Sequence, residues 1–485
     1  MKRLLIITMA LLVSLIGCSN QTSHTTMNTT QDNATPDFDY SGKTILTWYS
    51  CANVKVENEI NIYLSSLGKN YAVKFVYEPA THDDHYFDSI KQKMENKEQI
   101  DILTTGYYDI EYDKFPTAYQ YYICSGMFLP LDDYLFSTEV GKKLYNQMPE
   151  GYWKALRADG SIYGLSVSGM LGSSPGYYVN KKLADKYGWD ISKPILDQID
   201  IMKKIEKKEN KVMPVYMGAD LGSASTVPNQ FCLIHGVYYD KSLDAVGRIT
   251  EDEEWLYGLK QLNTLVNEGL VTTWYNKDDP FETEQEFVDM FCAPADGYLE
   301  HGQISDHVGF VQFNDAYLCF DKMKYSIPSM ATGVASCSEN PDLAFDLLAT
   351  VNTDVYLNNL LTFDGAEPNE NGKMPLENLS SKFQSFFANR MICHKAEYES
   401  DNYSEWFTSV LSAEDTPVYW GFVFDVRPVQ DIYGKVASCV VSFDFCRKIP
   451  FEQLISELDE KLDNAGIDEL IAEINRQYDN WKNNN

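Results

Sequence analysis

The folded part of the chain begins with an alternation of strand-like and helix-like segments that restricts its fold more than any other feature. Residues 43–50, 72–79 and 100–106 are short runs rich in apolar and β-branched side chains, as in buried strands. Residues 56–68 and 85–98 separate these runs and carry apolar side chains at helical spacing. The order strand, helix, strand, helix, strand predicts parallel βαβ units and therefore an α/β fold.

Further helices are expected in the second half of the chain. Asn340 and Pro341 provide an N-cap and a first helical position for residues 342–351. The chain ends in two amphipathic helices separated by Gly466, with apolar stripes formed by Leu454, Leu458 and Leu462, and by Leu470, Ile471, Ile474, Tyr478 and Trp481. Because 485 residues are too many for one ordinary core, we expect two lobes or domains.

The first 17 residues have the pattern of a secretory signal peptide. Lys2 and Arg3 precede an uncharged stretch, Leu4 to Ile16. This stretch is too short for a membrane-spanning helix, which needs roughly 20 apolar residues. We therefore assign residues 1–17 to a signal peptide.

A cysteine directly follows this segment. Residues 15–18 read Leu-Ile-Gly-Cys and resemble the lipobox of bacterial lipoproteins. The resemblance implies that Cys18 is lipidated and that two or three acyl chains anchor the protein. An ordinary signal peptide with an incidental cysteine is the alternative. Residues 18–41 are expected to be a flexible tether, because residues 19–37 contain almost nothing that could be buried.

The charge of the chain excludes some partners. It has 40 basic and 71 acidic side chains, a formal net charge of −31. Such a field repels nucleic acid and anionic lipid surfaces. It suits neutral or cationic small molecules, although solubility alone accounts for it equally well.

Motifs for metals, cofactors and catalysis do not occur. The nine cysteines other than Cys18 form no C-x-x-C pair, and we interpret them mostly as small buried hydrophobic residues. His82 and His85 lack the i, i+4 spacing of a helical zinc motif, and the carboxylates between them suit a helix N-cap. Residues 109–120 have lysine and glutamine where a calcium loop needs glycine and glutamate. We expect no metal, no cofactor and no catalytic residue.

Several segments together resemble a known family. They are KTILTWYS, QIDILTTGYYD, GMFLPLDDYL, MPEGYWKALRADGSIYGL, YYVNKKLADKYGWDISK, ENPDLAFDLLATVNTDVYLNNLL, WGFVFDVRP and NAGIDELIAEINRQYDNWK. Their order and coverage, from about residue 43 to 482, resemble the family 1 extracellular solute-binding lipoproteins of bacterial ABC importers, in the branch with an uncharacterised C-terminal domain. The chain departs from the family at Ser166, where proline is usual, and in residues 362–368, which are usually richer in glycine.

The resemblance implies a two-lobed, periplasmic-binding-protein-like (type II) α/β fold with a hinge and an inter-lobe ligand cleft. The N-lobe is expected from residues 42–166 plus about 325–410, and the C-lobe from about 170–320 plus 415–485. The chain should cross between the lobes near residues 165–178, 318–330 and 405–421. We expect a monomer that delivers its ligand to an ABC permease.

Aromatic and acidic side chains follow the predicted strands. Open α/β sheets bind ligands beyond the carboxyl ends of their strands. The residues expected there are Trp48, Tyr49, Tyr107, Tyr108 and Asp109, and weaker candidates are Asp220, Glu300, His301 and Trp420. Because a sugar has an apolar face and a rim of hydroxyls, flat rings beside carboxylates suit a carbohydrate.

The sequence therefore predicts a lipid-anchored, extracytoplasmic protein that captures a carbohydrate, and an oligosaccharide in particular, since several aromatic loops offer more than one stacking surface. One alternative keeps the fold and makes the ligand a peptide, or the role sensory. In that case the negative field favours cationic peptides. The other alternative is a secreted glycoside hydrolase, which needs two carboxylates ~5 to 9.5 Å apart.

Overall fold

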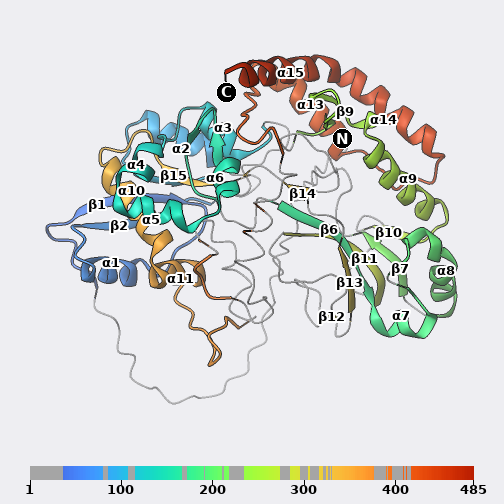
Figure 1. The fold of residues 1–485 in the computed structure, drawn as a ribbon, viewed down its shortest axis with the longest axis horizontal. Helices are drawn as coiled ribbons and strands as arrows, with labels where there is room; N and C mark the ends of the chain where they lie inside the picture. Colours follow the sequence, from blue (N-terminus) through green and yellow to red (C-terminus); the bar gives the residue numbers. More distant parts are fainter. Residues whose placement is uncertain are drawn as a thin grey trace, which may run out of the picture.

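The computed structural model places the chain in two lobes (Figure 1). It describes residues 37–79, 86–106, 115–166, 172–190, 192–209, 212–217, 234–273, 285–294, 304–305, 316–320, 324–325, 328, 330–375, 389, 391–395, 408, 411 and 417–484. We call the lobe around the sheet that contains β1 the N-lobe, and the lobe around the sheet that contains β6 the C-lobe.

The N-lobe sheet has four strands in the order β15-β3-β1-β2. Strands β1 (Thr44–Ser50), β2 (Tyr71–Tyr77) and β3 (Ile102–Thr104) are parallel. Strand β15 (Thr332–Val334) joins the sheet antiparallel to β3. The three parallel strands and the helices between them confirm the βαβ reading of the sequence, whereas β15 was not predicted.

Helices surround the N-lobe sheet. They are α1 (Glu57–Ser66), α2 (Tyr86–Glu95), α3 (Ala118–Cys124), α4 (Asp132–Ser137), α5 (Glu139–Gln147), α6 (Glu150–Leu156), α10 (Pro341–Thr353) and α11 (Val355–Phe363), with a small hairpin of β4 (Arg157–Ala158) and β5 (Ser161–Ile162). Asn340 occupies the N-cap position of α10, as predicted, but its side chain makes no capping hydrogen bond. The first-position proline, Pro341, is present as expected.

The C-lobe sheet is larger and mixed. Its strands are β10 (Val271–Thr273), β7 (Val212–Met217), β11 (Gln285–Pro294), β6 (Gly172–Asn180), β13 (Ala316–Phe320) and β12 (Ile304–Ser305) in that order, with β14 (Lys324–Tyr325) paired to β6. Strands β10, β7 and β11 are parallel, and β6 is antiparallel to β11, β13 and β14. Helices α7 (Lys181–Tyr187) and α8 (Ile199–Lys208) lie at the outer end of this lobe (Figure 1).

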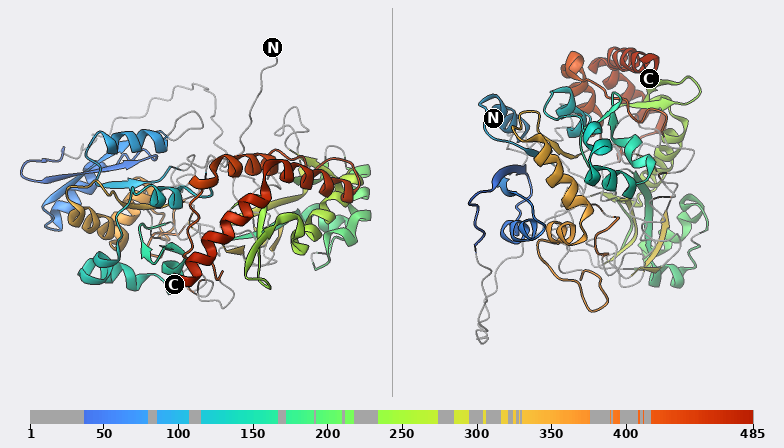
Figure 2. Two further views of the ribbon diagram at one scale, coloured as in Figure 1. Left: turned by 90° about the horizontal axis from the view of Figure 1, so that it is seen from above. Right: turned by 60° about the vertical axis from the view of Figure 1, so that its left-hand side comes forward.

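A helical layer runs along one side of the molecule. It contains α9 (Glu253–Asn267), α13 (Gln430–Val441), α14 (Phe451–Ala465), α15 (Ile467–Asn484) and the hairpin of β8 (Val237–Asp240) and β9 (Ala245–Arg248). Gly466, at φ +92°, separates α14 from α15 as predicted, because its left-handed conformation ends a helix without a Cβ penalty. Figures 1 and 2 show that α15 carries the C-terminus back to the N-lobe.

Residues 38–40 contact the folded body, although the predicted tether extends to residue 41. The amide of Phe38 donates a hydrogen bond to Asn58 Oδ1 at 2.7 Å, and the hydroxyl of Tyr40 donates one to Glu57 Oε1 at 2.8 Å. The Phe38 and Tyr40 rings also pack edge to face. These contacts attach residues 38–40 to α1, so the predicted tether is too long at its C-terminal end.

Candidate functional site

The N-lobe ends of two chain crossings meet at the carboxyl edge of the N-lobe sheet. The first leaves the N-lobe after Ser166 and enters the C-lobe sheet at Gly172, the first residue of β6. The second leaves β14 after Tyr325 and joins β3 at Thr332. The first passage between the sheets thus falls between Ser166 and Gly172, and the second between Tyr325 and Thr332.

Backbone hydrogen bonds hold these two crossings together. Leu165 and Thr332 exchange two hydrogen bonds, N to O, of 2.8 Å each. The neighbouring residue, Ala331, exchanges two more with Thr105 just beyond β3: Thr105 N donates to Ala331 O at 2.9 Å, and Ala331 N donates to Thr105 Oγ1 at 3.1 Å. Both crossings therefore lie beside the end of β3, where a ligand of an open α/β sheet is expected.

Tyr152 of α6 fixes the first crossing at its start. Its hydroxyl donates a hydrogen bond to the Ser166 carbonyl at 2.8 Å and accepts one from the Ser166 amide at 3.1 Å. Burial raises the pKa of this phenol, so it stays protonated and can donate. The sequence analysis did not predict a role for Tyr152. The only indication was Ser166, which stands where the family usually has proline and therefore has an amide that can donate a hydrogen bond.

A third junction lies in the turn at residues 419–422. Gln120 Nε2 of α3 donates to the Phe422 carbonyl at 3.0 Å, and the Asp159 amide donates to the Gly421 carbonyl at 3.2 Å. On the other side, the Phe422 ring packs edge to face on Tyr478 of α15, with centroids 5.4 Å apart. The turn thus joins the N-lobe to the C-terminal helical layer, next to the third predicted crossing region.

Burial also shapes the electrostatics of these junctions. It raises the pKa of the Asp159 carboxyl, because charge is disfavoured away from water. Beyond the turn, Arg427 binds Asp425 through two hydrogen bonds of 2.7 Å and lowers the pKa of that carboxyl. The amide and carbonyl of Asp425 bond to the Gln477 side chain of α15, each at 2.9 Å.

The predicted contact of Trp48 with the ligand is wrong, because the Trp48 side chain is fully buried. The indole Nε1 donates to Thr104 Oγ1 at 3.0 Å, and the ring packs on Phe75. Strand β1 lies between two neighbouring strands and under helices, so side chains on both of its faces become buried. Trp48 therefore belongs to the core of the N-lobe.

Two other predicted ligand contacts are also buried. Tyr49 is 7% exposed, and burial is the main cause of the raised pKa of its phenol. Trp420 is 8% exposed and lies in the turn that joins the lobes, so it is placed at a junction and not on an open surface.

The remaining predicted contacts are Tyr107, Tyr108, Asp109, Asp220, Glu300 and His301, and they lie outside the described residues, as do His82 and His85. The strands that precede them are known: β3 ends at Thr104, β7 at Met217 and β11 at Pro294. Strands β7 and β11 are parallel neighbours in the C-lobe sheet.

Within the part of the chain that the structure describes, no three His, Cys, Asp or Glu side chains form a group able to hold a metal ion. The described helices include none with the length and apolar character that crossing a membrane requires. Cys124, Cys337 and Cys439 are free thiols.

Comparisons with known proteins agree with this architecture. Residues 418–483 match the model of a domain of unknown function, DUF3502. A carbohydrate ABC transporter substrate-binding protein of Streptococcus pneumoniae is 21% identical over 387 residues, 71% of this chain and 74% of that protein. The chain is thus similar to an extracellular solute-binding protein of a carbohydrate ABC transporter, and its C-terminal part matches the DUF3502 domain.

Solved structures show the same fold for this chain. The N-glycan transport solute-binding protein NgtS of S. pneumoniae matches with a TM-score of 0.69 at 18% identity, covering 90% of this chain and 99% of that one. NgtS has also been solved in complex with Man5GlcNAc. FusA of S. pneumoniae, solved in complex with kestose, matches with a TM-score of 0.53 at 12% identity, covering 91% and 99%.

The DUF3502 match gives the helical layer a defined extent. It begins at Val418, in the turn that joins the lobes, and contains α13, α14 and nearly all of α15. The domain is therefore not a separate appendage, because its first residues bond to the N-lobe and its helices pack beside the β8–β9 hairpin.

Proposed function

We propose that this protein is a solute-binding protein that captures an oligosaccharide between its lobes and delivers it to an ABC permease. The observation that carries the proposal is the meeting of both chain crossings at the carboxyl edge of the N-lobe sheet. A ligand at that edge lies next to the hinge, so its contacts can favour one arrangement of the lobes over another. The sugars that are bound by NgtS and FusA support a carbohydrate as the ligand class.

Ligand contacts are proposed in the loops that follow the parallel strands of both sheets. Tyr107 and Tyr108 would stack on sugar rings, while Asp109, Asp220 and Glu300 would accept hydrogen bonds from hydroxyls. Trp48 is not among the proposed ligand contacts, because its fully buried indole ring cannot stack on a sugar. The protein binds and releases its ligand unchanged, as solute-binding proteins do.

The anchor and the transporter complete the proposal. Lipid on Cys18 would hold the protein at the outer face of the membrane, and residues 19–37 would connect the anchor to the first ordered contacts at Phe38. The permease would contact the two lobes in their closed arrangement.

Calorimetry on residues 38–485 with Man5GlcNAc and kestose tests the ligand class and site. We expect saturable binding of at least one sugar, and a tenfold or larger loss of affinity in Tyr108→Ala, about 1.4 kcal/mol. Tyr257→Ala, which removes an exposed ring of α9, is the matched control. Unchanged affinity in Tyr107→Ala and Tyr108→Ala would contradict the placement. Binding of a cationic peptide such as trilysine, with no heat from sugars, would contradict the ligand class.

Fatty-acid labelling of cells that express the full chain tests the anchor. Wild type should incorporate label, and Cys18→Ser should accumulate as an unlabelled precursor. Cys51→Ser, a substitution within the folded body, should retain the label. Equal labelling of wild type and Cys18→Ser would rule out the lipid anchor.

A further inference from the structure

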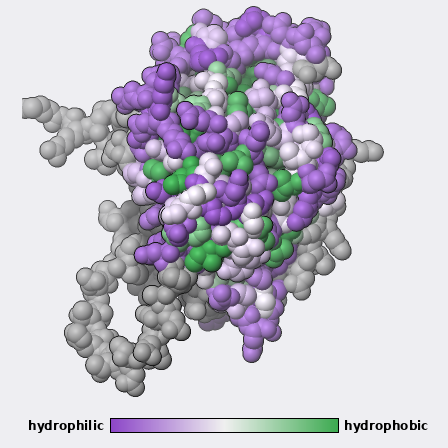
Figure 3. Space-filling model, turned by 90° about the vertical axis from the view of Figure 1, so that its left-hand side faces the viewer, coloured by the Kyte–Doolittle hydropathy of each residue, from purple (hydrophilic) through white to green (hydrophobic). Residues whose placement is uncertain are grey.

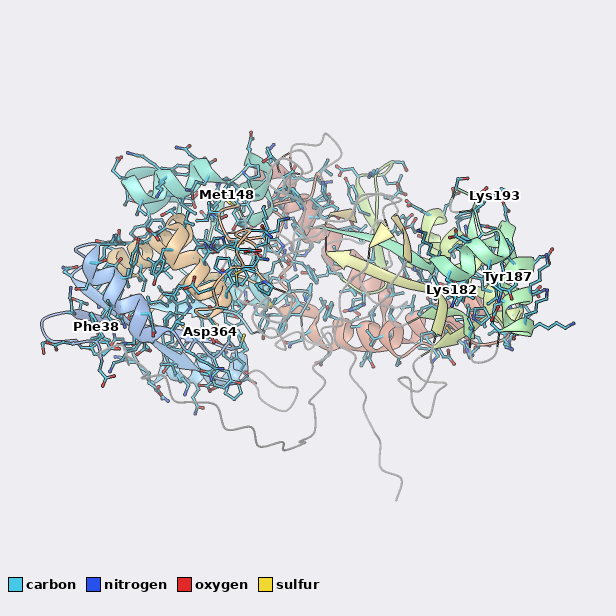
Figure 4. The ribbon with its side chains drawn as sticks, turned by 90° about the horizontal axis from the view of Figure 1, so that it is seen from below. Phe38, Met148, Lys182, Tyr187, Lys193 and Asp364 are labelled. Carbon is cyan, nitrogen blue, oxygen red and sulfur yellow. The ribbon has the colours of Figure 1, made fainter. Side chains whose placement is uncertain are left out.

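The N-lobe contains a pocket of about 540 Å³ that the proposed function does not use. It lies between α1, the junction of α10 with α11, and the loop at residues 365–368. All of its lining residues belong to the N-lobe, so the pocket forms without the C-lobe. Asp364, next to this loop, lies on the N-lobe side in Figure 4, and Lys182 and Lys193 lie at the opposite end of the molecule.

Two tyrosine rings form the aromatic part of the pocket. The rings of Tyr63 and Tyr356 are 4.5 Å apart between centroids and inclined at 42°. Tyr356 remains 50% exposed despite this contact, and the adjacent Val355 is 53% exposed. The N-lobe side of the molecule is otherwise mainly hydrophilic, with small apolar areas (Figure 3). An aromatic face is thus available to a ligand in the pocket.

Polar groups in the same pocket are held in fixed orientations. Asp354 caps α11 through Oδ1, which accepts from the Leu357 amide at 3.0 Å, while its Oδ2 accepts from the Tyr63 hydroxyl at 3.4 Å. The long bond to Tyr63 leaves Oδ2 able to accept further hydrogen bonds, since a carboxylate oxygen has two lone pairs.

Two nitrogen donors complete the polar lining. Asn359 Oδ1 accepts a hydrogen bond from the His394 amide at 2.7 Å. Asn359 Nδ2 donates one of its two hydrogens to the Val355 carbonyl at 2.7 Å. The second Nδ2 hydrogen can bind another partner. Lys143 Nζ donates one hydrogen bond to the Thr353 carbonyl at 2.9 Å and has two further hydrogens. The pocket thus offers an acceptor and two donors beside an aromatic face.

We propose that this pocket is a second saccharide-binding site, separate from the inter-lobe site and independent of lobe closure. A pyranose ring would lie on Tyr356, with its hydroxyls bonded to Asp354 Oδ2, Asn359 Nδ2 and Lys143 Nζ. The volume lies within the roughly 300–1,000 Å³ of small-molecule sites and admits one or two sugar units. The proposal rests on the carbohydrate function and adds a place for a sugar unit outside the inter-lobe space.

Fluorine NMR on residues 38–485 tests the site directly. The protein carries 3-fluorotyrosine at position 356, or at position 257 as a matched exposed control on α9. The probes are methyl β-D-glucopyranoside, methyl α-D-mannopyranoside and N-acetylglucosamine, and calorimetry with Man5GlcNAc and kestose runs in parallel. We expect at least one probe to shift the resonance at 356 in a saturable manner and to leave that at 257 unchanged. Asp354→Asn, which keeps a capping oxygen, should weaken this response about tenfold or more.

The outcomes separate this pocket from the inter-lobe site. If calorimetry detected oligosaccharide binding and the resonance at position 356 did not shift, the second saccharide site would be refuted and the proposed function would stand. Equal shifts at 356 and 257 would show non-specific contact and also overturn it. If calorimetry and both fluorine labels gave no response, the pocket and the carbohydrate function would fall together. A saturable shift at 356 that Asp354→Asn leaves unweakened would refute the assigned contacts.

Discussion

The hydroxyl of Tyr152 bonds to both backbone groups of Ser166, the carbonyl at 2.8 Å and the amide at 3.1 Å. Tyr152 is 3% exposed and Ser166 is 6% exposed, so water cannot replace these bonds. A proline at position 166 would have no amide to donate. The serine therefore permits an attachment of the first crossing to α6 that a proline would lack.

Tyr152→Phe should destabilise the protein by about 1–3 kcal/mol, because it leaves a buried amide and a buried carbonyl without their partner. Urea unfolding at neutral pH measures the loss. Ser166→Ala is the control, since the Ser166 hydroxyl has no hydrogen-bond partner within the described ranges and should be dispensable. If both variants lost equal stability, the backbone bonds would not be the cause.

Gly421→Ala should destabilise the protein by about 1–2 kcal/mol, because Gly421 has φ +99° and a side chain there is strained. The same substitution at Gly258, within α9 and with open space around its Cβ position, should stabilise by about 0.5–1 kcal/mol. Thermal unfolding of the two variants beside wild type gives the comparison. A stabilised Gly421→Ala protein would show that the turn tolerates another conformation.

Arg248 of β9 bonds to two aspartates near the junction of α14 and α15, Asp463 and Asp468, at 2.7 Å each. Arg248→Gln should cost about 2 kcal/mol at low salt, because it removes charged hydrogen bonds and leaves carboxylates facing each other. The loss should shrink in 1 M NaCl, which screens that repulsion. Arg476→Gln, which removes the pair of the exposed Arg476 with the partly buried Glu473 within α15, should cost less, about 0.5 kcal/mol. A salt-independent loss at Arg248 would argue against the electrostatic cause.

Asp425 should contribute to acid unfolding. The hydrogen bonds from Arg427 lower the pKa of this carboxyl from its ordinary value of 3.8 in the folded state. A lowered folded pKa means that the stabilisation is complete above the unfolded pKa and is lost as the pH falls through the folded one. Asp425→Asn should therefore flatten the decline in unfolding free energy between neutral pH and pH 2. Glu460→Gln, on the exposed face of α14, should decline as wild type does.

Local patterns in the sequence predicted much of the fold. The spacing of apolar residues located α1 and α2, the Asn340-Pro341 pair located α10, and Gly466 separated α14 from α15. Each of these signals acts within one or two turns of the element it marks. Strand β15 has no comparable signal, because its pairing with β3 joins residues more than 200 positions apart.

The candidate site was harder to predict for a related reason. The position of Trp48 near the end of a strand suggested exposure, but whether a strand end is open depends on which helices and crossings cover it. Thr104, which accepts the Trp48 indole hydrogen, is itself bonded to Thr332 of the returning chain at 2.9 Å. A contact between three distant segments leaves no pattern in any one of them.

The hydrogen-bonded pairing of Leu165 with Thr332 fastens the N-lobe ends of two crossings to each other. Neither of these residues can shift without moving the other or breaking the pair. We therefore expect the two crossings to share one pivot at the N-lobe, so that the lobes return to the same relative arrangement each time they close.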